Sequence, residues 1–190
     1  MDPGQDGERV AASLAHRLAG LTFVDLTTDR VTARLVDAVV EWATGEGWRV
    51  YRRAASVLPL PPPLSGRQSV LDVACARPDR PPVVVEVDHT DRRRTVEKLL
   101  AEAEAGRIPI WLRWGVPGFT APPAPIRMVT IEVSRRNGPA GQGRLYSRRP
   151  AVDRPAPAHS VPAGGPAEPV ALPIPAPDEP DRAARDVRRS

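Results

Sequence analysis

Apolar residues recur at the spacing of an α-helix in three stretches of the chain. In the first two stretches they occupy positions 10, 14 and 18, and then positions 31, 35, 36, 39, 40 and 43. The third has them at positions 96, 99, 100 and 103, between Asp91, a residue suited to cap a helix, and Gly106, which can end one. This pattern predicts amphipathic helices over 8–19, 30–45 and 92–105, the second of them capped by Asp29.

Five shorter stretches are rich in β-branched and aromatic residues and are bounded by Gly, Pro or charged residues. They predict strands over 48–54, 69–75, 82–88, 108–114 and 126–134. The expected order is one helix, then helix, three strands, helix and strand, then a final strand. We therefore expect an α/β fold in which flanking helices cover a mixed β-sheet with an αβββαβ core.

Composition changes after about Ser134. The stretch 137–190 holds 11 of the 24 prolines, and Tyr146 is its single aromatic residue. A segment of this kind buries too little apolar surface to offset the entropy of ordering its backbone. The sequence therefore predicts a flexible N-terminus over 1–7, one α/β domain over 8–134, and a disordered Arg/Pro/Ala-rich tail over 135–190.

The net charge of +4 belongs to the C-terminal part of the chain. Residues 1–116 carry 16 basic and 16 acidic side chains, whereas residues 117–190 carry 11 and 7. Two interpretations of the Arg-rich stretch 135–154 stay open: it binds nucleic-acid phosphates without sequence preference, or it is a soluble extension. The Pro-rich stretch 155–180 is either a linker or a ligand for a protein partner with a Pro-binding groove.

Several classes of protein are excluded by simple counts. One cysteine, Cys75, cannot form an intramolecular disulfide framework or a four-cysteine zinc site. No stretch approaches the 18 or so apolar residues of a membrane span, and the acidic start is unlike a signal peptide. We therefore expect a cytoplasmic protein with no membrane partner.

Acidic residues on two neighbouring predicted strands are the most informative chemical feature. If a hairpin is centred on Asp79, residues whose numbers sum to 158 face each other, and Asp72 then lies opposite Glu86. Their Cβ atoms would be roughly 5 Å apart, with Asp88 about 7 Å further along the same face. Alternatively, the three acids lie on a solvated sheet face and pair with arginines.

Three carboxylates this close, among valines, raise each other's pKa. A divalent cation relieves the conflict, because Mg²⁺ is usually held by one or two carboxylates together with water and phosphate oxygens. The pattern favours a site in which Asp72 and Glu86 bind Mg²⁺ or Mn²⁺ and Asp88 assists a ligand or a water molecule. Such a site can activate water against a phosphodiester.

With this order of elements, residues 30–115 resemble the restriction-endonuclease-like nucleases, the PD-(D/E)-x-K superfamily. The family motif maps onto Asp72 as the hairpin Asp and onto Glu86-Val87-Asp88 as the E-x-K element. The VEKL and IWLRW segments are also similar to those of actinobacterial-type proteins with an acidic strand. The resemblance implies a metal-dependent nuclease acting on DNA or RNA.

The sequence departs from the family motif where the family has a lysine, since Asp88 stands there. Lys98 is the only lysine among 27 basic residues, but it lies nearly opposite the apolar stripe of its helix, which predicts an exposed side chain. Glu41, the candidate for the helix Glu of many family members, falls outside its own apolar arc and is also expected to be solvated. Arg92 and Arg93 are expected to hold substrate phosphate, with an exposed basic turn as the alternative.

The remaining candidates are expected to be structural. His89 follows Asp88, but alternation turns it to the other face, and Cys75 is expected to be a buried apolar thiol. The leading hypothesis is metal-dependent phosphodiester hydrolysis. The alternative is a nuclease-fold module without catalysis that binds nucleic acid or a protein, partly through its tail.

Overall fold

A computed structural model describes residues 3–139 and 143–150 of the chain. Three helices are present in this part: α1 (Pro3–Ala19), α2 (Thr28–Gly45) and α3 (Arg93–Glu104). The strands are β1 (Phe23–Leu26), β2 (Arg49–Pro59), β3 (Gln68–Arg77), β4 (Arg80–Asp88), β5 (Ile108–Gly115), β6 (Arg127–Glu132), β7 (Ser134–Asn137) and β8 (Arg144–Arg148). The expected α/β class is confirmed.

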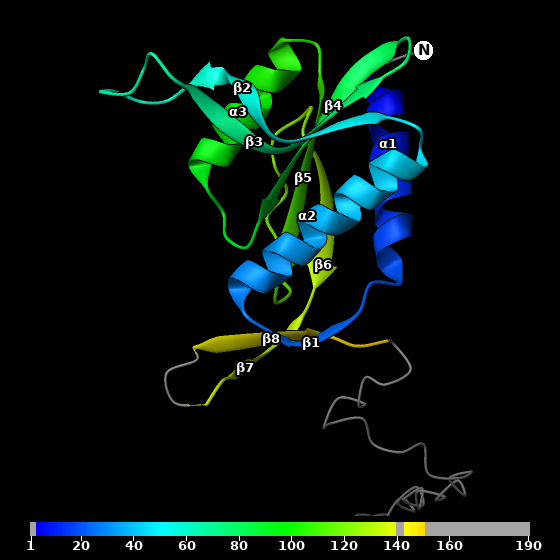
Figure 1. The fold of residues 1–190 in the computed structure, drawn as a ribbon, viewed down its shortest axis with the longest axis vertical. Helices are drawn as coiled ribbons and strands as arrows, with labels where there is room; N and C mark the ends of the chain where they lie inside the picture. The colour runs from blue at the N-terminus through cyan, green and yellow to red at the C-terminus, as the bar shows by residue number, and fades with distance from the viewer. Residues whose placement is uncertain (1–2, 140–142, 151–190) are drawn as a thin grey trace, which may run out of the picture. The chain divides into compact units, whose positions relative to one another are not determined.

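The main sheet is mixed and has five strands in the order β2-β3-β4-β5-β6. Strands β2, β3 and β4 form an antiparallel meander, whereas β4, β5 and β6 are mutually parallel. Helix α3 provides the crossover between β4 and β5, as a parallel pair requires. The element order from α2 to β5 is the expected αβββαβ (Figure 1).

Two apolar cores lie on the two faces of this sheet. The larger one contains residues of α1 and α2 together with strand residues such as Val73, Val85 and Leu112. The smaller one joins Leu99 of α3 to Trp111 and other strand residues. Helices α1 and α2 therefore cover one face and α3 covers the other. None of the helices in the described ranges is long and apolar enough to cross a membrane.

The N-terminal boundary of the expected domain is wrong. Helix α1 begins at Pro3, where a flexible segment over 1–7 was expected. Asp6 explains the earlier start, because its carboxylate is buried and accepts a 2.6 Å hydrogen bond from Arg77 of β3 and a 2.9 Å hydrogen bond from Arg9. The bond to Arg77 holds the first turns of α1 against the sheet, whereas the bond to Arg9 lies within the helix. Arg77 lowers the pKa of Asp6.

The expected tail also begins too early in the chain. Residues 134–148 contain β7 and β8, which join β1 in a second, three-stranded sheet of order β1-β8-β7. Two arginines have structural partners here, since Arg136 forms a bidentate ion pair with Asp25 and Arg148 donates to the carbonyls of Leu18 and Leu21 at the C-terminal end of α1. Tyr146 is buried in the larger core. The rest of the expected tail, 151–190, lies outside the described residues, and so does the Pro-rich stretch.

Candidate functional site

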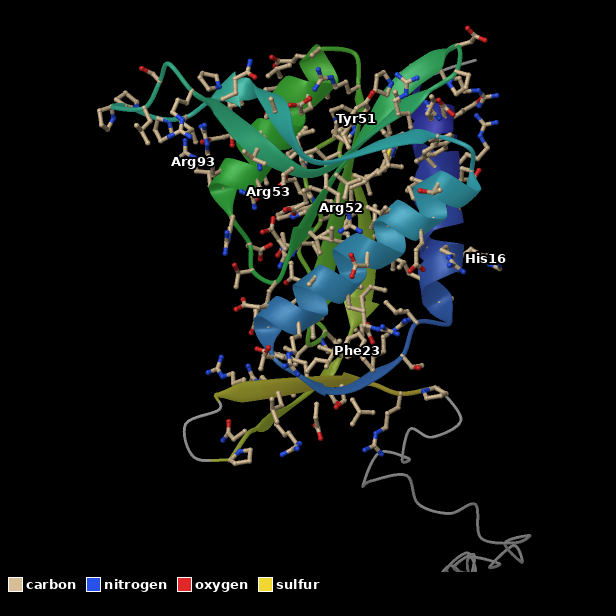
Figure 2. The ribbon with its side chains drawn as sticks, viewed as in Figure 1. His16, Phe23, Tyr51, Arg52, Arg53 and Arg93 are labelled. Carbon is tan, nitrogen blue, oxygen red and sulfur yellow. The ribbon has the colours of Figure 1, made fainter. Side chains whose placement is uncertain are left out.

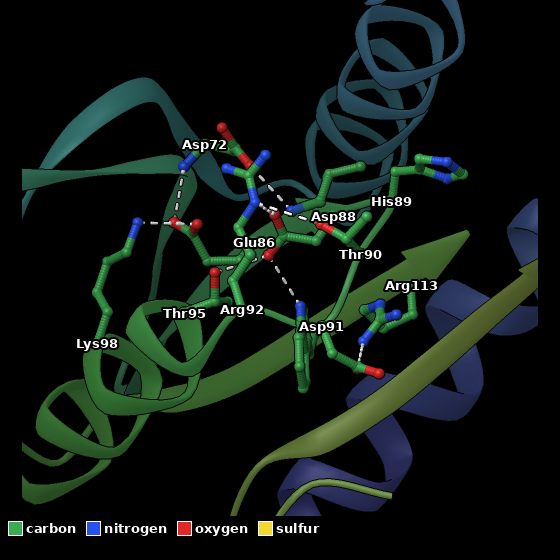
Figure 3. Close-up of polar contacts among 12 residues, drawn as sticks. Asp72, Glu86, Asp88, His89, Thr90, Asp91, Arg92, Thr95, Lys98 and Arg113 are labelled. Atoms are coloured by element: carbon green, nitrogen blue, oxygen red, sulfur yellow. Dashed lines mark hydrogen bonds and ion pairs between the residues drawn. The ribbon is translucent and has the colours of Figure 1, made fainter. Parts of the chain in front are cut away.

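Strands β3 and β4 separate at the point where the acidic residues lie. Their backbone pairing follows the expected register, in which Val73 faces Val85, and the ladder ends at this pair. Beyond it, the Val87 N–H donates to Asp72 Oδ2 at 2.9 Å, and the Asp72 N–H donates to Glu86 Oε1 at 3.2 Å. Each carboxylate therefore takes the place of a backbone carbonyl of its own strand as the acceptor for an N–H of the neighbouring strand. The structure brings Asp72 and Glu86 together (Figure 3).

The β2–β3 ribbon turns over at the same place. Val73 packs in the core with α1 and α2, but Leu71, only two residues earlier, packs in the core with α3. On β2, Arg53 has a φ of 51°, a left-handed conformation that costs a residue with a side chain about 1–2 kcal/mol. The register of β2 and β3 places Arg53 opposite Asp72. These two residues mark the turn-over. Burial raises the pKa of Asp72, and the charge of Arg53 is one of the contributions that oppose this rise.

Glu86 is a buried carboxylate with a buried cationic partner. Its Oε2 lies 2.8 Å from Lys98 Nζ, and the two side chains are only 7% and 9% exposed. Lys98 Nζ also donates to the Val70 carbonyl at 2.6 Å, so the ammonium spans the gap between the two separated strands. Burial raises the pKa of Glu86 to about 7; Lys98 opposes this rise and the charge of Asp72 adds to it.

The expectation that Lys98 is exposed is wrong. The buried residues of α3 are Thr95, Lys98, Leu99 and Glu102, so the buried face is rotated by about one residue from the apolar stripe. Three of these four are polar, and each has a partner on a strand: Asp88, Glu86 and Ser56 respectively. Apolar periodicity could not identify a buried face made mostly of paired polar residues.

Asp88 is buried and holds the start of α3 in place. Its Oδ2 accepts hydrogen bonds from Thr95 Oγ1 at 2.8 Å and from Trp111 Nε1 at 3.0 Å. Its Oδ1 lies 3.8 Å from Arg92 Nε. Because Oδ2 already has two donors, Oδ1 is the atom of Asp88 that remains for a ligand or a water molecule.

The two arginines expected to hold phosphate differ in position. Arg92 is 68% exposed and lies beside Asp88 at the edge of the acidic cluster (Figure 3). Arg93 is 91% exposed and pairs with Glu97, one turn further along the outer face of α3. The structure brings Arg92 to the cluster and leaves Arg93 outside it. Asp91 is not the cap of α3, because the N-cap residue is Arg92 and Asp91 contacts Arg113 instead.

The other candidates lie away from the cluster. Glu41 is exposed and pairs with Arg17 of α1, on the helices of the opposite face. His89 stacks on Trp114 and lies 3.1 Å from the Tyr146 hydroxyl, so it joins β4 to the small sheet. Cys75 is buried, and burial raises its pKa to about 12, which keeps it a thiol.

The donor set fits a hard divalent cation. Asp72 and Glu86 supply carboxylate oxygens, and burial raises the pKa of both. Lys98 is in ion-pair contact with Glu86, whereas Asp72 has no cationic group within ion-pair distance in the part of the chain that the structure describes. Within residues 3–139 and 143–150, no group of three or more His, Cys, Asp and Glu side chains is arranged to hold a metal. A cation here would take oxygens from this pair and from water or phosphate, the arrangement that Mg²⁺ commonly adopts.

Sequence reasoning missed several residues that build this site, namely Arg53, Thr95, Lys98 and Trp111. One signal for Lys98 was available: a chain that otherwise uses arginine at every basic position keeps a lysine here. Comparisons with known proteins give no match, since no family model, no curated protein and no solved structure matches this chain. Functional assignment therefore depends on the geometry of the site.

Proposed function

We propose that the chain is a metal-dependent phosphodiester hydrolase of the restriction-endonuclease-like type, acting on DNA or RNA. Asp72 and Glu86 would hold Mg²⁺ or Mn²⁺. The observation that carries the proposal is the ion pair between Lys98 Nζ and Glu86 Oε2 at 2.8 Å. The lysine that the family motif has on the strand, where this chain has Asp88, is supplied from α3 instead.

Each residue of the site has a chemical task in this proposal. A bound divalent cation supplies a Lewis acid and lowers the pKa of water. Lys98 places a positive charge at Glu86, where it can orient a water molecule or stabilise negative charge on the phosphate. Burial raises the pKa of Glu86 to about 7, and because a ligand to the cation must be deprotonated, metal binding would strengthen as the pH rises through 7. Arg92 presents an exposed guanidinium that a phosphate can reach.

A second candidate function keeps the fold without catalysis. Lys98 also donates to the Val70 carbonyl, which lies beyond the end of the β3–β4 ladder, and this contact alone gives the lysine a structural reason to be buried. In that case the domain is a module that binds nucleic acid or a protein. The Pro-rich stretch, a candidate contact for a protein partner, belongs to the undescribed residues.

The test is a cleavage assay on the purified full chain. Single- and double-stranded DNA and RNA are incubated with Mg²⁺, Mn²⁺ or EDTA, using wild type, Asp72→Asn, Glu86→Gln and Lys98→Met. We expect cleavage with metal only, reduced at least about 100-fold in each variant. Glu41→Gln, which changes an exposed acid on the opposite face, is the matched control and should cut like wild type.

Two results would contradict the proposal. One is the absence of cleavage of every substrate under all metal conditions. The other is cleavage by Asp72→Asn and Glu86→Gln at the wild-type rate, which would assign the activity to another site or to a contaminant. Circular dichroism of each variant separates loss of chemistry from loss of fold.

A further inference from the structure

Strand β2 is an edge strand of the main sheet, and part of it carries exposed basic and aromatic side chains. Arg49, Tyr51 and Arg53 occupy alternate positions; we call these three residues the β2 shelf. Val50, between the first two, packs against the core that contains α1 and α2. By alternation Arg49 and Tyr51 lie on the other face, the face that carries α3 and the acidic cluster. Arg53 stands where the ribbon turns over, at the register position of Asp72.

The partners of the shelf on β3 are small. Arg49 faces Ala76 and Tyr51 faces Ala74 in the backbone register. Alanine side chains cannot cover a phenol ring or a guanidinium, and Tyr51 is 46% exposed. Figure 2 shows Tyr51 on this strand together with Arg52 and Arg53. The shelf therefore presents an uncovered aromatic face beside two cationic groups.

The charges of the shelf are available to an outside partner. Strand β2 contains three arginines and no acidic residue. Arg52, on the other face, is paired with Asp37 of α2 at 2.8 Å. Across the described ranges, neither Arg49 nor Arg53 has an acidic group within ion-pair distance. Both guanidiniums can therefore bind an anion without first breaking an internal ion pair.

The shelf leads directly to the candidate metal site. The register of β2 and β3 places Arg53 opposite Asp72, and alternate residues of a strand are spaced by about 6.8 Å. A polyanion lying along the shelf would thus reach Asp72 after passing Arg49, Tyr51 and Arg53. Arg53, the shelf residue beside Asp72, is also the residue with the left-handed backbone, with a φ of 51°.

We infer that the β2 shelf binds a single-stranded nucleic acid, with a base stacked on Tyr51 and phosphates held by Arg49 and Arg53. This inference rests on the proposed function and specifies its substrate class. A single strand is favoured because its bases offer free faces for stacking, whereas the bases of a duplex are already stacked on each other. Basic grooves with exposed aromatic rings are typical of such binding.

The experiment measures binding of the full chain in EDTA, so that metal-dependent cleavage does not interfere. Fluorescent single-stranded DNA and RNA, a hairpin duplex and a poly-glutamate peptide serve as probes. We expect the single strands to bind at least about tenfold more tightly than the duplex. Tyr51→Ala should weaken their binding about tenfold, and Tyr51→Phe, which keeps the ring, should stay within about twofold of wild type.

The arginines are tested through the salt dependence of binding. Arg49→Gln and Arg53→Gln should each lower the slope of log K against log salt by about 0.7, the value for one phosphate contact on a single strand. Arg34→Gln, an exposed arginine on α2, is the matched control and should leave both affinity and slope unchanged. Thermal denaturation checks that each variant is folded.

The inference is overturned if Tyr51→Ala and Arg53→Gln bind single strands like wild type. Tighter binding of the duplex or of the acidic peptide also overturns it, because the shelf would then serve another partner. Failure of the shelf is distinguishable from failure of the proposed function. Cleavage that depends on Asp72 but not on Tyr51 would contradict the binding role of the β2 shelf and support the hydrolase. Binding that depends on the shelf, without any cleavage, would support the shelf and contradict the hydrolase.

Discussion

Replacing Lys98 by methionine tests the central ion pair of the site. Methionine keeps most of the apolar stem of lysine and removes the ammonium. In the structure, this ammonium lies 2.8 Å from Glu86 Oε2 and donates to the Val70 carbonyl at 2.6 Å, and both charged side chains are at least nine-tenths buried. Lys98→Met therefore leaves the buried Glu86 carboxylate without its cationic partner and removes the hydrogen bond to the Val70 carbonyl.

The expected cost depends on pH. Breaking a buried ion pair by removing one partner destabilises a protein by about 3–5 kcal/mol. The pKa of Glu86 is about 7 with Lys98 present and rises further without it, so below pH 6 the carboxyl group is protonated and the loss is smaller. We expect Lys98→Met to lower the free energy of unfolding by about 3 kcal/mol at pH 8. At pH 5 the loss is about 1 kcal/mol, the net contribution of the lost hydrogen bond to the Val70 carbonyl.

Urea denaturation of wild type, Lys98→Met, Glu86→Gln and the double variant at both pH values measures this effect. At pH 8 the double variant should be more stable than the sum of the single losses implies, with a coupling of about 2–3 kcal/mol. Arg93→Met, on the exposed face of the same helix, should stay within about 0.5 kcal/mol of wild type. Additive losses of Lys98→Met and Glu86→Gln at pH 8, or a loss below about 1 kcal/mol in Lys98→Met at pH 8, would show that the two side chains do not form a stabilising ion pair.

Two further predictions concern pH and backbone conformation. Burial raises the pKa of Glu86 from 4.5 to about 7 in the folded state, so its contribution to stability is fully present below pH 4.5 and is lost as the pH rises through 7. In denaturation experiments this loss amounts to about 3 kcal/mol of unfolding free energy. It should vanish in Glu86→Gln and shrink when Mg²⁺ is added. An unfolding free energy of wild type that stays constant between pH 4.5 and 8 would contradict the prediction. Arg53→Gly should leave the free energy of unfolding unchanged or raise it by up to about 1 kcal/mol, because glycine adopts a φ of 51° without strain. Arg52→Gly in the same strand should lower it by about 1 kcal/mol. Equal losses in the two variants would show that the conformation of Arg53 is not strained.

The expected register of the acidic hairpin is present in the structure because local chemistry determines it. A turn around Asp79 between two strands that contain valines leaves little freedom in the pairing of the strands. Val73 faces Val85, as expected for residues whose numbers sum to 158. The αβββαβ order was likewise predictable, because long apolar stripes and β-branched runs alternate along the chain. These are the features that depend on neighbouring residues alone.

The missed features depend on residues far apart in the sequence. Lys98 is buried because Glu86 and the Val70 carbonyl, on two separated strands, offer it acceptors. The turn-over of the β2–β3 ribbon at Arg53 has no signal in hydrophobic alternation. A helix that covers a polar site has a polar buried face. The apolar periodicity therefore locates α3 correctly along the chain but predicts the wrong side of the helix as its buried face.

The small sheet shows the same limit for composition. Residues 134–148 are rich in arginine and poor in aromatic residues, which predicted disorder. One aromatic side chain, Tyr146, nevertheless packs edge-on against Trp114 and His89. Arg136 is paired with Asp25, and Arg148 donates to carbonyls at the C-terminal end of α1, so both stabilise structure as well as contributing charge. Average composition cannot separate arginines with such partners from solvated ones.

The most direct test of the central claim is the position of a divalent cation. Crystals soaked in Mn²⁺ and measured near the manganese absorption edge would give an anomalous difference map. We predict a peak in contact with the carboxylates of Asp72 and Glu86, and its loss in Asp72→Asn crystals. Manganese bound elsewhere on the domain, with no peak between these two carboxylates, would contradict it.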